Sequence, residues 1–171
     1  SGTWSVKELA QDIAAEFPDK NYLIFDVSVD RDVVTEGNMM GVAAGLAASG
    51  NIVFASSFAM FATGRAYEQI RNSIGYPRLN VKICASHAGI TVGEDGASHQ
   101  TFEDISLMRG IPNMIVVCPA DGVEASKAIR AVAAYDGPCY VRLGRSAVET
   151  VYDEDMDFQI GKGNVLRAGK K

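Results

Sequence analysis

The fold class is decided by a stretch that opens with Ile52-Val-Phe-Ala-Ser56 and closes with Asn80-Val-Lys-Ile-Cys-Ala85. Both runs are short and nearly continuously apolar, which is typical of strands that are buried on both faces of a parallel sheet. The segment between them is long enough for a helix, which we expect over Phe61–Ile74. A strand, a helix and a second strand in this order predict a right-handed parallel β-α-β unit.

The same alternation runs along most of the chain. Ser5-Val-Lys-Glu8 has the spacing of a capping box and predicts a helix that starts near Ser5. Repeated β-α-β connections predict an α/β fold, with a doubly wound, mostly parallel sheet and helices on both of its faces. Further strands are expected at Tyr22–Val29, Met114–Cys118 and Cys139–Leu143, and further helices at Gly37–Ser49, Phe102–Met108 and Gly122–Tyr135.

The first connection is irregular. Asp32-Val-Val-Thr35 also has the composition of a short strand, but it lies only two or three residues after Val29. Parallel neighbours need a crossover of roughly a dozen residues or more. Either these residues do not form a parallel strand, or a segment is absent at this point.

Length and composition predict one domain. The chain has 171 residues, of which 47% are apolar and 22% charged, enough to bury a normal core. We expect a single domain over residues 1–160, and we interpret residues 161–171 as the truncated start of a following domain or linker. The longest apolar stretch, Met39 to Ala48, is too short to span a bilayer, so no membrane segment is expected.

Charge and cysteine content narrow the class of partner. The formal net charge is -5 and there is no basic run, so neither a nucleic acid nor an anionic membrane surface is indicated. We expect small molecules or proteins as partners. Cys84, Cys118 and Cys139 are widely spaced in apolar, strand-like contexts, which predicts buried free thiols in the reducing cytoplasm rather than disulfides or a metal cluster.

Polar and aromatic residues follow every predicted strand. In open α/β sheets, ligands bind beyond the carboxyl ends of the strands. We therefore expect a carboxylate, two aromatic rings, two histidines and an arginine to share one edge of the sheet as a binding site. The residues in question are Glu36, Ser57, Phe58, Phe61, His87, His99, Asp121 and Arg145.

Both histidines lie in one segment, His87-Ala-Gly-Ile-Thr-Val-Gly-Glu-Asp-Gly-Ala-Ser-His99, which we call the histidine loop. Its Gly and Ser residues permit tight turns and close approach of the backbone to a ligand, which favours a binding site. A solvated surface loop with two exposed histidines is the alternative.

Glu36 begins a helix that carries no further charge and has Gly41 and Gly45 one turn apart. We expect this helix to be buried nearly all round, with its glycines packed most simply against a second subunit. The Glu36 carboxylate either interacts with the helix dipole or faces a ligand. Phe58 and Phe61 either offer a ring face to a flat heterocycle or belong to the core.

Three segments together resemble the pyrimidine-binding domain of transketolase: Glu36-Gly-Asn-Met-Met-Gly-Val-Ala-Ala-Gly-Leu-Ala, Ser57-Phe-Ala-Met-Phe61 with Arg65-Ala-Tyr-Glu-Gln-Ile-Arg71, and Ser86 to Gln100. The resemblance runs from about Val33 to Lys162, and Gly93-Glu-Asp-Gly96 is its most specific part. It implies the fold of the thiamine diphosphate-binding Pyr domain. Related enzymes such as deoxyxylulose-phosphate synthase share this architecture but depart more from the histidine loop.

The resemblance implies a cofactor site. Glu36 matches the catalytic glutamate that hydrogen-bonds N1′ of the aminopyrimidine of thiamine diphosphate and thereby promotes formation of its ylide. Phe61 matches the aromatic residue that stacks on the pyrimidine, with Phe58 in the same pocket.

It also implies a substrate site. His87 and His99 match catalytic histidines that contact the sugar, and Asp95 matches an aspartate that contacts a hydroxyl of the donor. Arg145 matches an arginine that binds the sugar phosphate, for which a bidentate guanidinium is suited.

The implied reaction is the transfer of a two-carbon ketol unit from a ketose phosphate to an aldose phosphate in the pentose phosphate pathway. The family binds the diphosphate and its Mg or Ca through a Gly-Asp-Gly motif followed by Asn on another domain. This chain lacks that motif, so we expect no metal here and no activity without a diphosphate-binding partner. A homodimer is also expected.

Two departures accompany the resemblance. The family has a longer connection between the first strand and the glutamate, and the irregularity at Asp30–Val33 falls at that point. Gly64 is an apparent extra residue before Arg65. A non-catalytic association fragment, or the Pyr domain of another thiamine diphosphate enzyme, remains an alternative.

Overall fold

The computed structural model describes residues 6–26 and 35–169. They contain a five-stranded sheet in the order β1-β2-β3-β5-β4, in which every neighbouring pair is parallel. The expected α/β fold with a parallel sheet is confirmed. The strands are β1 (Tyr22–Asp26), β2 (Ile52–Phe58), β3 (Val81–Ser86), β4 (Ile115–Val117) and β5 (Cys139–Arg142).

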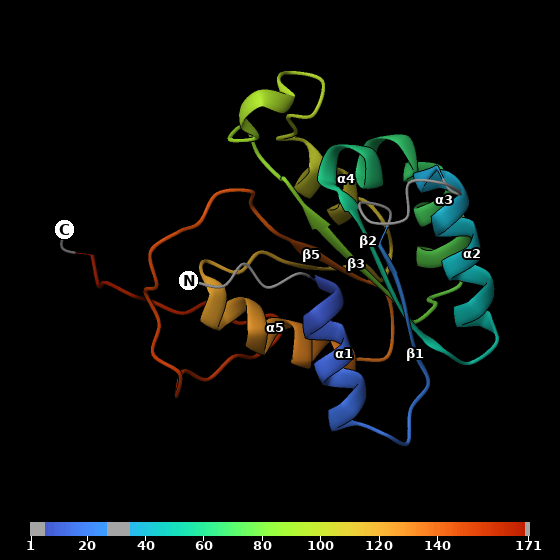
Figure 1. Cartoon of the computed structure of the whole chain (residues 1–171), viewed down its shortest axis with the longest axis horizontal. Helices are drawn as coiled ribbons and strands as arrows, with labels where there is room; N and C mark the ends of the chain where they lie inside the picture. Colours follow the sequence, from blue (N-terminus) through green and yellow to red (C-terminus); the bar gives the residue numbers. More distant parts are fainter. Residues whose placement is uncertain (1–5, 27–34, 170–171) are drawn as a thin grey trace.

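Helices cover both faces of the sheet, as Figure 1 shows. One face is packed by α1 (Val6–Glu16) and α5 (Gly122–Ala134), and the other by α2 (Glu36–Ala48) with the helical segment that follows β2. The short helix α4 (Asp104–Arg109) joins the second layer. Because side chains alternate along a strand, Val53 and Ala55 of β2 enter one core while Phe54 enters the other.

Four of the five observed strands differ from the predicted ones by one or two residues at their ends, and the last three residues of the strand predicted over Tyr22–Val29 lie outside the described residues. β2 continues to Phe58 because Ser57 and Phe58 pair with Ala85 and Ser86 of β3. Of the irregular run before the second helix, only Thr35 lies within the described residues, where it precedes α2. The capping residue Ser5 lies outside them.

The helix predicted over Phe61–Ile74 is wider than an α-helix. It consists of a π-helical turn η1 (Phe61–Arg65), a short α3 (Tyr67–Gln69) and a second π-helical segment η2 (Ile70–Gly75). In η1 the amide of Ala66 donates to the carbonyl of Phe61, 3.2 Å away and five residues earlier. Such turns accommodate an extra residue within a helix and are frequent at functional sites.

The expectation that α2 is buried nearly all round is wrong for the single chain. Met40 and Ala43 are completely buried, but Gly41, Val42 and Gly45 are exposed on the opposite face. A Cβ atom placed on either glycine would meet nothing within 4 Å. We call Gly41, Val42 and Gly45 the open α2 face.

The cysteines are all free, as predicted, but they are not all buried. Cys84 and Cys139 lie in the core, whereas Cys118 is exposed. Cys118 follows β4, which is an edge strand and therefore has a neighbouring strand on one side only.

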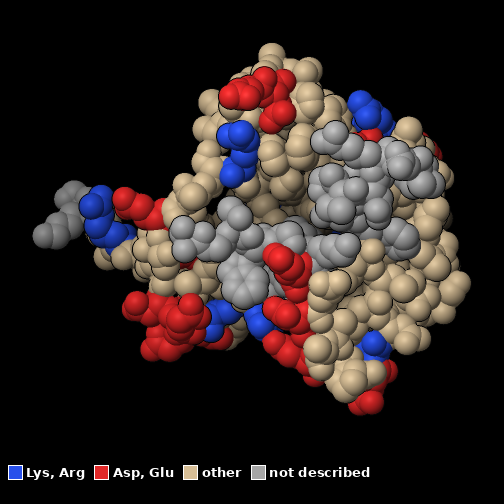
Figure 2. Space-filling model, viewed as in Figure 1, with Lys and Arg blue, Asp and Glu red and all other residues tan. Residues whose placement is uncertain are grey.

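Figure 2 shows the charged side chains on one face of the molecule. On the face shown in Figure 2, acidic side chains gather in several patches, and the Lys and Arg side chains described there form no continuous stripe. No helix in the described part of the chain combines the length and apolar character needed to cross a membrane. After β5, residues 143–169 form no helix or strand. Phe158 and Ile160 nevertheless pack against the core between α5 and the sheet.

Candidate functional site

The carboxyl ends of β2 and β3 meet at the edge of the sheet from which the histidine loop protrudes (Figure 1). Phe58 ends β2, His87 directly follows β3, and Phe61 begins η1. Glu36, the first residue of α2, lies against the same elements. The structure therefore brings together side chains that are far apart in the sequence, since Glu36 and His99 are separated by 63 positions.

Glu36 is a buried carboxylate with two partners. Only 6% of its surface is exposed. Its Oε1 accepts a hydrogen bond from Ser57 Oγ at 3.2 Å, and its Oε2 accepts one from Arg65 Nη1 at 2.9 Å. The side chain thus lies in the first turn of α2, where the helix dipole favours it, and also faces β2 and η1.

Four rings form one cluster. The imidazole of His87 stacks on Phe58, with ring centroids 4.0 Å apart, and Phe58 is stacked with Phe61 at 6.3 Å. His99 meets Phe61 edge-on at 4.8 Å and Phe58 at 5.8 Å. These aromatic residues are only half-buried, so they are not simply part of the core.

His87 is held in an uncommon conformation. Its φ of 59° lies in the left-handed region, which residues other than glycine adopt rarely. Its Nδ1 lies 3.0 Å from Ser86 Oγ. Burial lowers the pKa of His87 below its ordinary value of 6.5, the charge of Asp95 raises this pKa, and the charges of Arg145 and His99 lower it.

Arg145 packs against the turn that carries Asp95. Gly93 begins this turn, the 3-10 segment η3 (Gly93–Asp95), with a φ of 67°. A Cβ atom on Gly93 would lie 2.9 Å from Arg145 Nη1. The positive φ favours glycine here, and the absence of a side chain also leaves room for the guanidinium.

Backbone hydrogen bonds hold both ends of the histidine loop in place. The amide of Ala88 donates to the carbonyl of Leu143 after β5, and the amide of Thr101 donates to the carbonyl of Gly89, each at 3.0 Å. These backbone bonds hold the ends of the loop, while Gly and Ser shape its interior.

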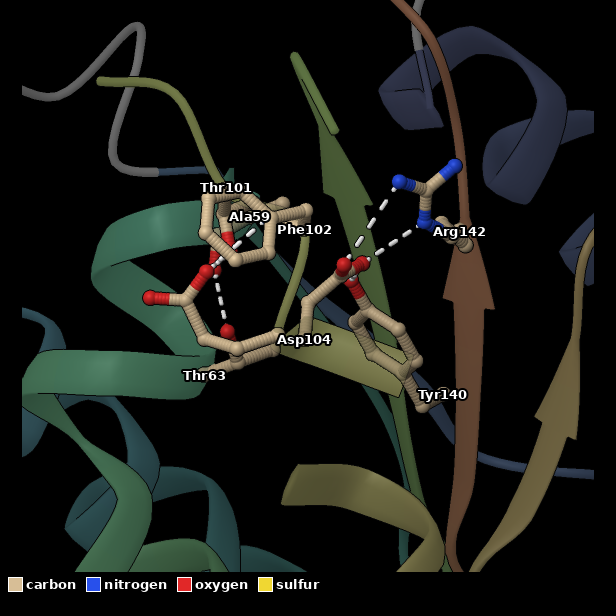
Figure 3. Close-up of polar contacts among 8 residues, drawn as sticks. Ala59, Thr63, Thr101, Phe102, Asp104, Tyr140 and Arg142 are labelled. Atoms are coloured by element: carbon tan, nitrogen blue, oxygen red, sulfur yellow. Dashed lines mark hydrogen bonds and ion pairs between the residues drawn. The ribbon is translucent and has the colours of Figure 1, made fainter. Parts of the chain in front are cut away.

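A buried polar cluster stands beside the loop (Figure 3). Asp104 has no exposed surface, and its Oδ2 accepts hydrogen bonds from Tyr140 Oη and Arg142 Nε, both at 2.7 Å. Arg142 also lies close to Gly89, since a Cβ atom there would be 3.6 Å from its Nη2. Asp104 and Arg142 therefore support the base of the loop.

Sequence reasoning missed Asp104, Arg142 and the contact of Arg65 with Glu36. Arg65 belongs to a segment that resembles the family, and Gly64, just before it, is an apparent extra residue. No motif singled out Asp104, which is the first residue of the short helix α4.

Asp121, expected at the same edge, has a structural role instead. Its Oδ1 accepts from the amide of Glu124, as an N-cap of α5 does, and its Oδ2 accepts from the amides of Val151 and Tyr152. Within residues 6–26 and 35–169, no three His, Cys, Asp or Glu side chains gather closely enough to hold a metal ion.

A parallel sheet with helices on both faces makes this an α/β domain, and its carboxylate, aromatic rings and imidazoles lie beyond the strand ends, where such domains bind ligands. Residues 10–150 match the family model described as the transketolase pyrimidine binding domain. The chain belongs to this family.

Similar proteins agree with this assignment. The chain is 55% identical over 159 residues to a protein of Methanocaldococcus jannaschii named as a transketolase C-terminal section, covering 92% of this chain and 48% of that protein. It is 44% identical over 136 residues to a 6-deoxy-6-sulfo-D-fructose transketolase subunit of a Clostridium species, covering 80% and 42%. The chain thus spans about half the length of these relatives.

A solved structure titled as a split gene transketolase, inactive beta4 tetramer, has the same fold. It superimposes with a TM-score of 0.81 at 44% identity, over 95% of this chain and 56% of that one. The pyrimidine-binding domain fold expected from the sequence is confirmed.

Proposed function

We propose that this chain is the pyrimidine-binding part of a split transketolase, which transfers a two-carbon ketol unit from a ketose phosphate to an aldose phosphate. The observation that carries this proposal is the buried carboxylate of Glu36 at the rim of the ring cluster. Its hydrogen-bond partner Arg65 places its guanidinium carbon 4.5 Å from the centroid of Phe61. A carboxyl group, which can hold a proton and donate it in a hydrogen bond, suits a planar nitrogen heterocycle when it lies beside an aromatic face.

The residues present fit the pyrimidine half of thiamine diphosphate. The Glu36 carboxyl, when protonated, would donate a hydrogen bond to a ring nitrogen, Phe61 would offer its face to the ring, and Phe58 would close the same pocket. Thiamine diphosphate, when bound, supplies the nucleophilic carbon and the electron sink of ketol transfer. Glu36 holds and exchanges a proton at the ring nitrogen in this scheme.

The rest of the cluster suits a sugar phosphate. His87, whose pKa is lowered, is mostly neutral at pH 7 and can both donate a hydrogen bond to a hydroxyl and accept one from it. His99 and Asp95 would contact further hydroxyls. Arg145 is exposed and would bind the terminal anionic group. One relative is named for a sulfosugar, which supports a sugar with an anionic group as the class of substrate.

The active assembly would need a second polypeptide. Two relatives are named as a C-terminal section and as a subunit, and a structural neighbour is titled as a split gene product, which supports a separate diphosphate-binding chain. That partner would bind the diphosphate with Mg or Ca. This chain would form homodimers in the cytoplasm and would be inactive alone.

The proposal is tested by mixing the chain with a matching diphosphate-binding subunit, thiamine diphosphate and magnesium, and by measuring ketol transfer from xylulose 5-phosphate to ribose 5-phosphate. We expect activity only when both proteins are present. Glu36→Gln should lower kcat at least about 100-fold, because it removes a proton-transfer group. Glu16→Gln, which changes an exposed carboxylate paired with Arg130, is the matched control. Undiminished turnover by Glu36→Gln would overturn the assignment.

A non-catalytic association fragment is the second candidate, favoured by the open α2 face. In that case the chain would self-assemble and would ignore thiamine diphosphate even with the partner present. Equilibrium dialysis of the cofactor against the mixed proteins separates the two candidates.

A further inference from the structure

The guanidinium of Arg65 contacts both groups that the proposed function assigns to the pyrimidine ring. Its Nη1 lies 2.9 Å from Glu36 Oε2, and its Cζ lies 4.5 Å from the centroid of the Phe61 ring. A guanidinium is planar and delocalised, and its N–H donors lie in its plane, so it can stack on an aromatic ring while it donates to a carboxylate. In the proposed function an aminopyrimidine would use the same two groups, by stacking on Phe61 and by hydrogen-bonding the Glu36 carboxyl.

The local helix geometry accounts for this position. Phe61 and Arg65 are the first and last residues of the π-helical turn η1, which contains the extra residue Gly64. Beyond it, Ala66 and Ile70 are completely buried and keep the helix packed against α2 and the sheet. The wider turn therefore takes up the extra residue before the helix returns to its packed register, and Arg65 is left on the side of Glu36.

The two partners of this ion pair differ in their freedom to move. The Glu36 side chain is 8% exposed, and its second oxygen is held by Ser57. The Arg65 side chain is 57% exposed, so it can turn into solvent without losing a buried environment. Because the Arg65 partner is mostly exposed, solvent screens part of the attraction and hydrates the guanidinium when the pair opens.

Building on the proposed function, we propose that Arg65 is a gate of the cofactor site, which occupies the place of the pyrimidine ring in the free chain and swings outward when the cofactor binds. When only a minor fraction of the molecules is open, the apparent affinity of a ligand that needs the open conformation falls in proportion to that fraction. We expect the Arg65–Glu36 pair to be closed most of the time. Removal of the Arg65 guanidinium should therefore raise the affinity for the pyrimidine ring by about five- to tenfold.

The test measures binding of 4-amino-5-hydroxymethyl-2-methylpyrimidine, the pyrimidine half of thiamine, to the full chain by ligand-observed NMR. Arg65→Ala should bind this probe about five- to tenfold more tightly than the unsubstituted chain. Arg71→Ala removes the same charge from an exposed site in the following π-helical segment and should leave the affinity unchanged. Glu36→Gln should weaken binding both in the unsubstituted chain and when it is combined with Arg65→Ala.

Equal or weaker binding by Arg65→Ala would overturn the gate. If the probe still binds and Glu36→Gln still weakens it, the pyrimidine site stands and only the gate fails. If no variant binds the probe, both the gate and the pyrimidine site proposed for this chain fail.

Discussion

Lys82 is a buried cation in the central strand β3, with no exposed surface. Its Nζ donates to the carbonyls of Tyr135 and Gly137, at 2.6 and 2.7 Å, just beyond the end of α5. Burial lowers the pKa of Lys82 from its ordinary value. Carbonyls at a helix C-terminus carry partial negative charge, so they compensate the ammonium. Because Lys82 lies on the α5 face, away from the ring cluster, its role is structural.

His87 carries the pH-dependent prediction. Because burial is the main cause of its lowered pKa, we expect this pKa below 6.5. Asp95→Asn should lower it further, and Arg145→Ala should raise it, because these charges act on His87 with opposite signs. The measurement is a titration of the imidazole resonances by NMR at low ionic strength, where screening is weak.

Two checks accompany this titration. His99→Gln identifies which of the two imidazole resonances belongs to His87. Between its folded pKa and 6.5 the native state binds fewer protons at His87 than the unfolded chain does, so the contribution of this group to the unfolding free energy rises with pH and is lost as the pH falls. A shift of the same sign in Asp95→Asn and Arg145→Ala would contradict the described arrangement of the loop.

At the scale of elements, α5 depends on its N-cap. Burial raises the pKa of Asp121, but hydrogen bonds from the amides of Glu124, Tyr152 and Val151 outweigh this effect, and its pKa is lowered overall. Asp121→Ala should lower the unfolding free energy by about 2–3 kcal/mol, because one N-cap and two further amide contacts are lost. Urea denaturation measures this loss.

Asp121→Asn is the matched variant for this helix. Asparagine keeps an N-cap oxygen but lacks the charge, so it should cost less than alanine. Because the pKa of Asp121 is lowered by folding, its stabilising contribution is present above the unfolded value and is lost as the pH falls. Equal losses in both variants would show that the hydrogen bonds to Asp121 are not what holds this end of α5.

The π-helical turns η1 and η2 could not be predicted from the sequence, although a helix at this place could. Phe61–Ile74 has the apolar spacing of a helix, and a helical segment is found there. The widening at η1 depends on how Ala66 and Ile70 pack against α2 and the sheet, which helical periodicity does not contain. The family resemblance marked Gly64 as an extra residue, but not how the helix would absorb it.

At the scale of the whole molecule, the open α2 face predicts self-association. Gly45→Arg should weaken dimer formation by at least about tenfold, because it places an unpaired charge in an interface of small residues. The fold of the single chain should be unaffected, since nothing lies within 4 Å of a Cβ atom at Gly45. Sedimentation equilibrium measures the dissociation constant.

Gly122→Arg is the matched control, because Gly122 also has nothing within 4 Å of its Cβ site and is the first residue of α5, on the other side of the sheet. It should leave association unchanged.

A second test uses Gly45→Ala, which should stabilise the isolated chain by about 0.5–1 kcal/mol through helix propensity if this face is free of contacts. A chain that remains monomeric at all concentrations would refute the dimer.

Much of the candidate site was predictable because it is built from strand ends. Glu36, Phe61, His87 and His99 follow predicted strands, and parallel strands bring their carboxyl ends to one edge. Asp121 also follows a predicted strand, but it caps α5 and does not join the site, because an aspartate directly before a helix can fill either role. Their catalytic and binding roles stay predictions, since they rest on the family match and not on contacts with a ligand.

By itself, the sequence determined the parallel α/β architecture, the place of each strand and the identity of the histidine loop, because these follow from local periodicity and from short motifs. Only the tertiary structure decided that Arg65 pairs with Glu36, that Asp104 and Arg142 support the loop, and that one face of α2 stays open. These features depend on which side chains meet across elements, and such meetings arise from packing in three dimensions rather than from spacing along the chain.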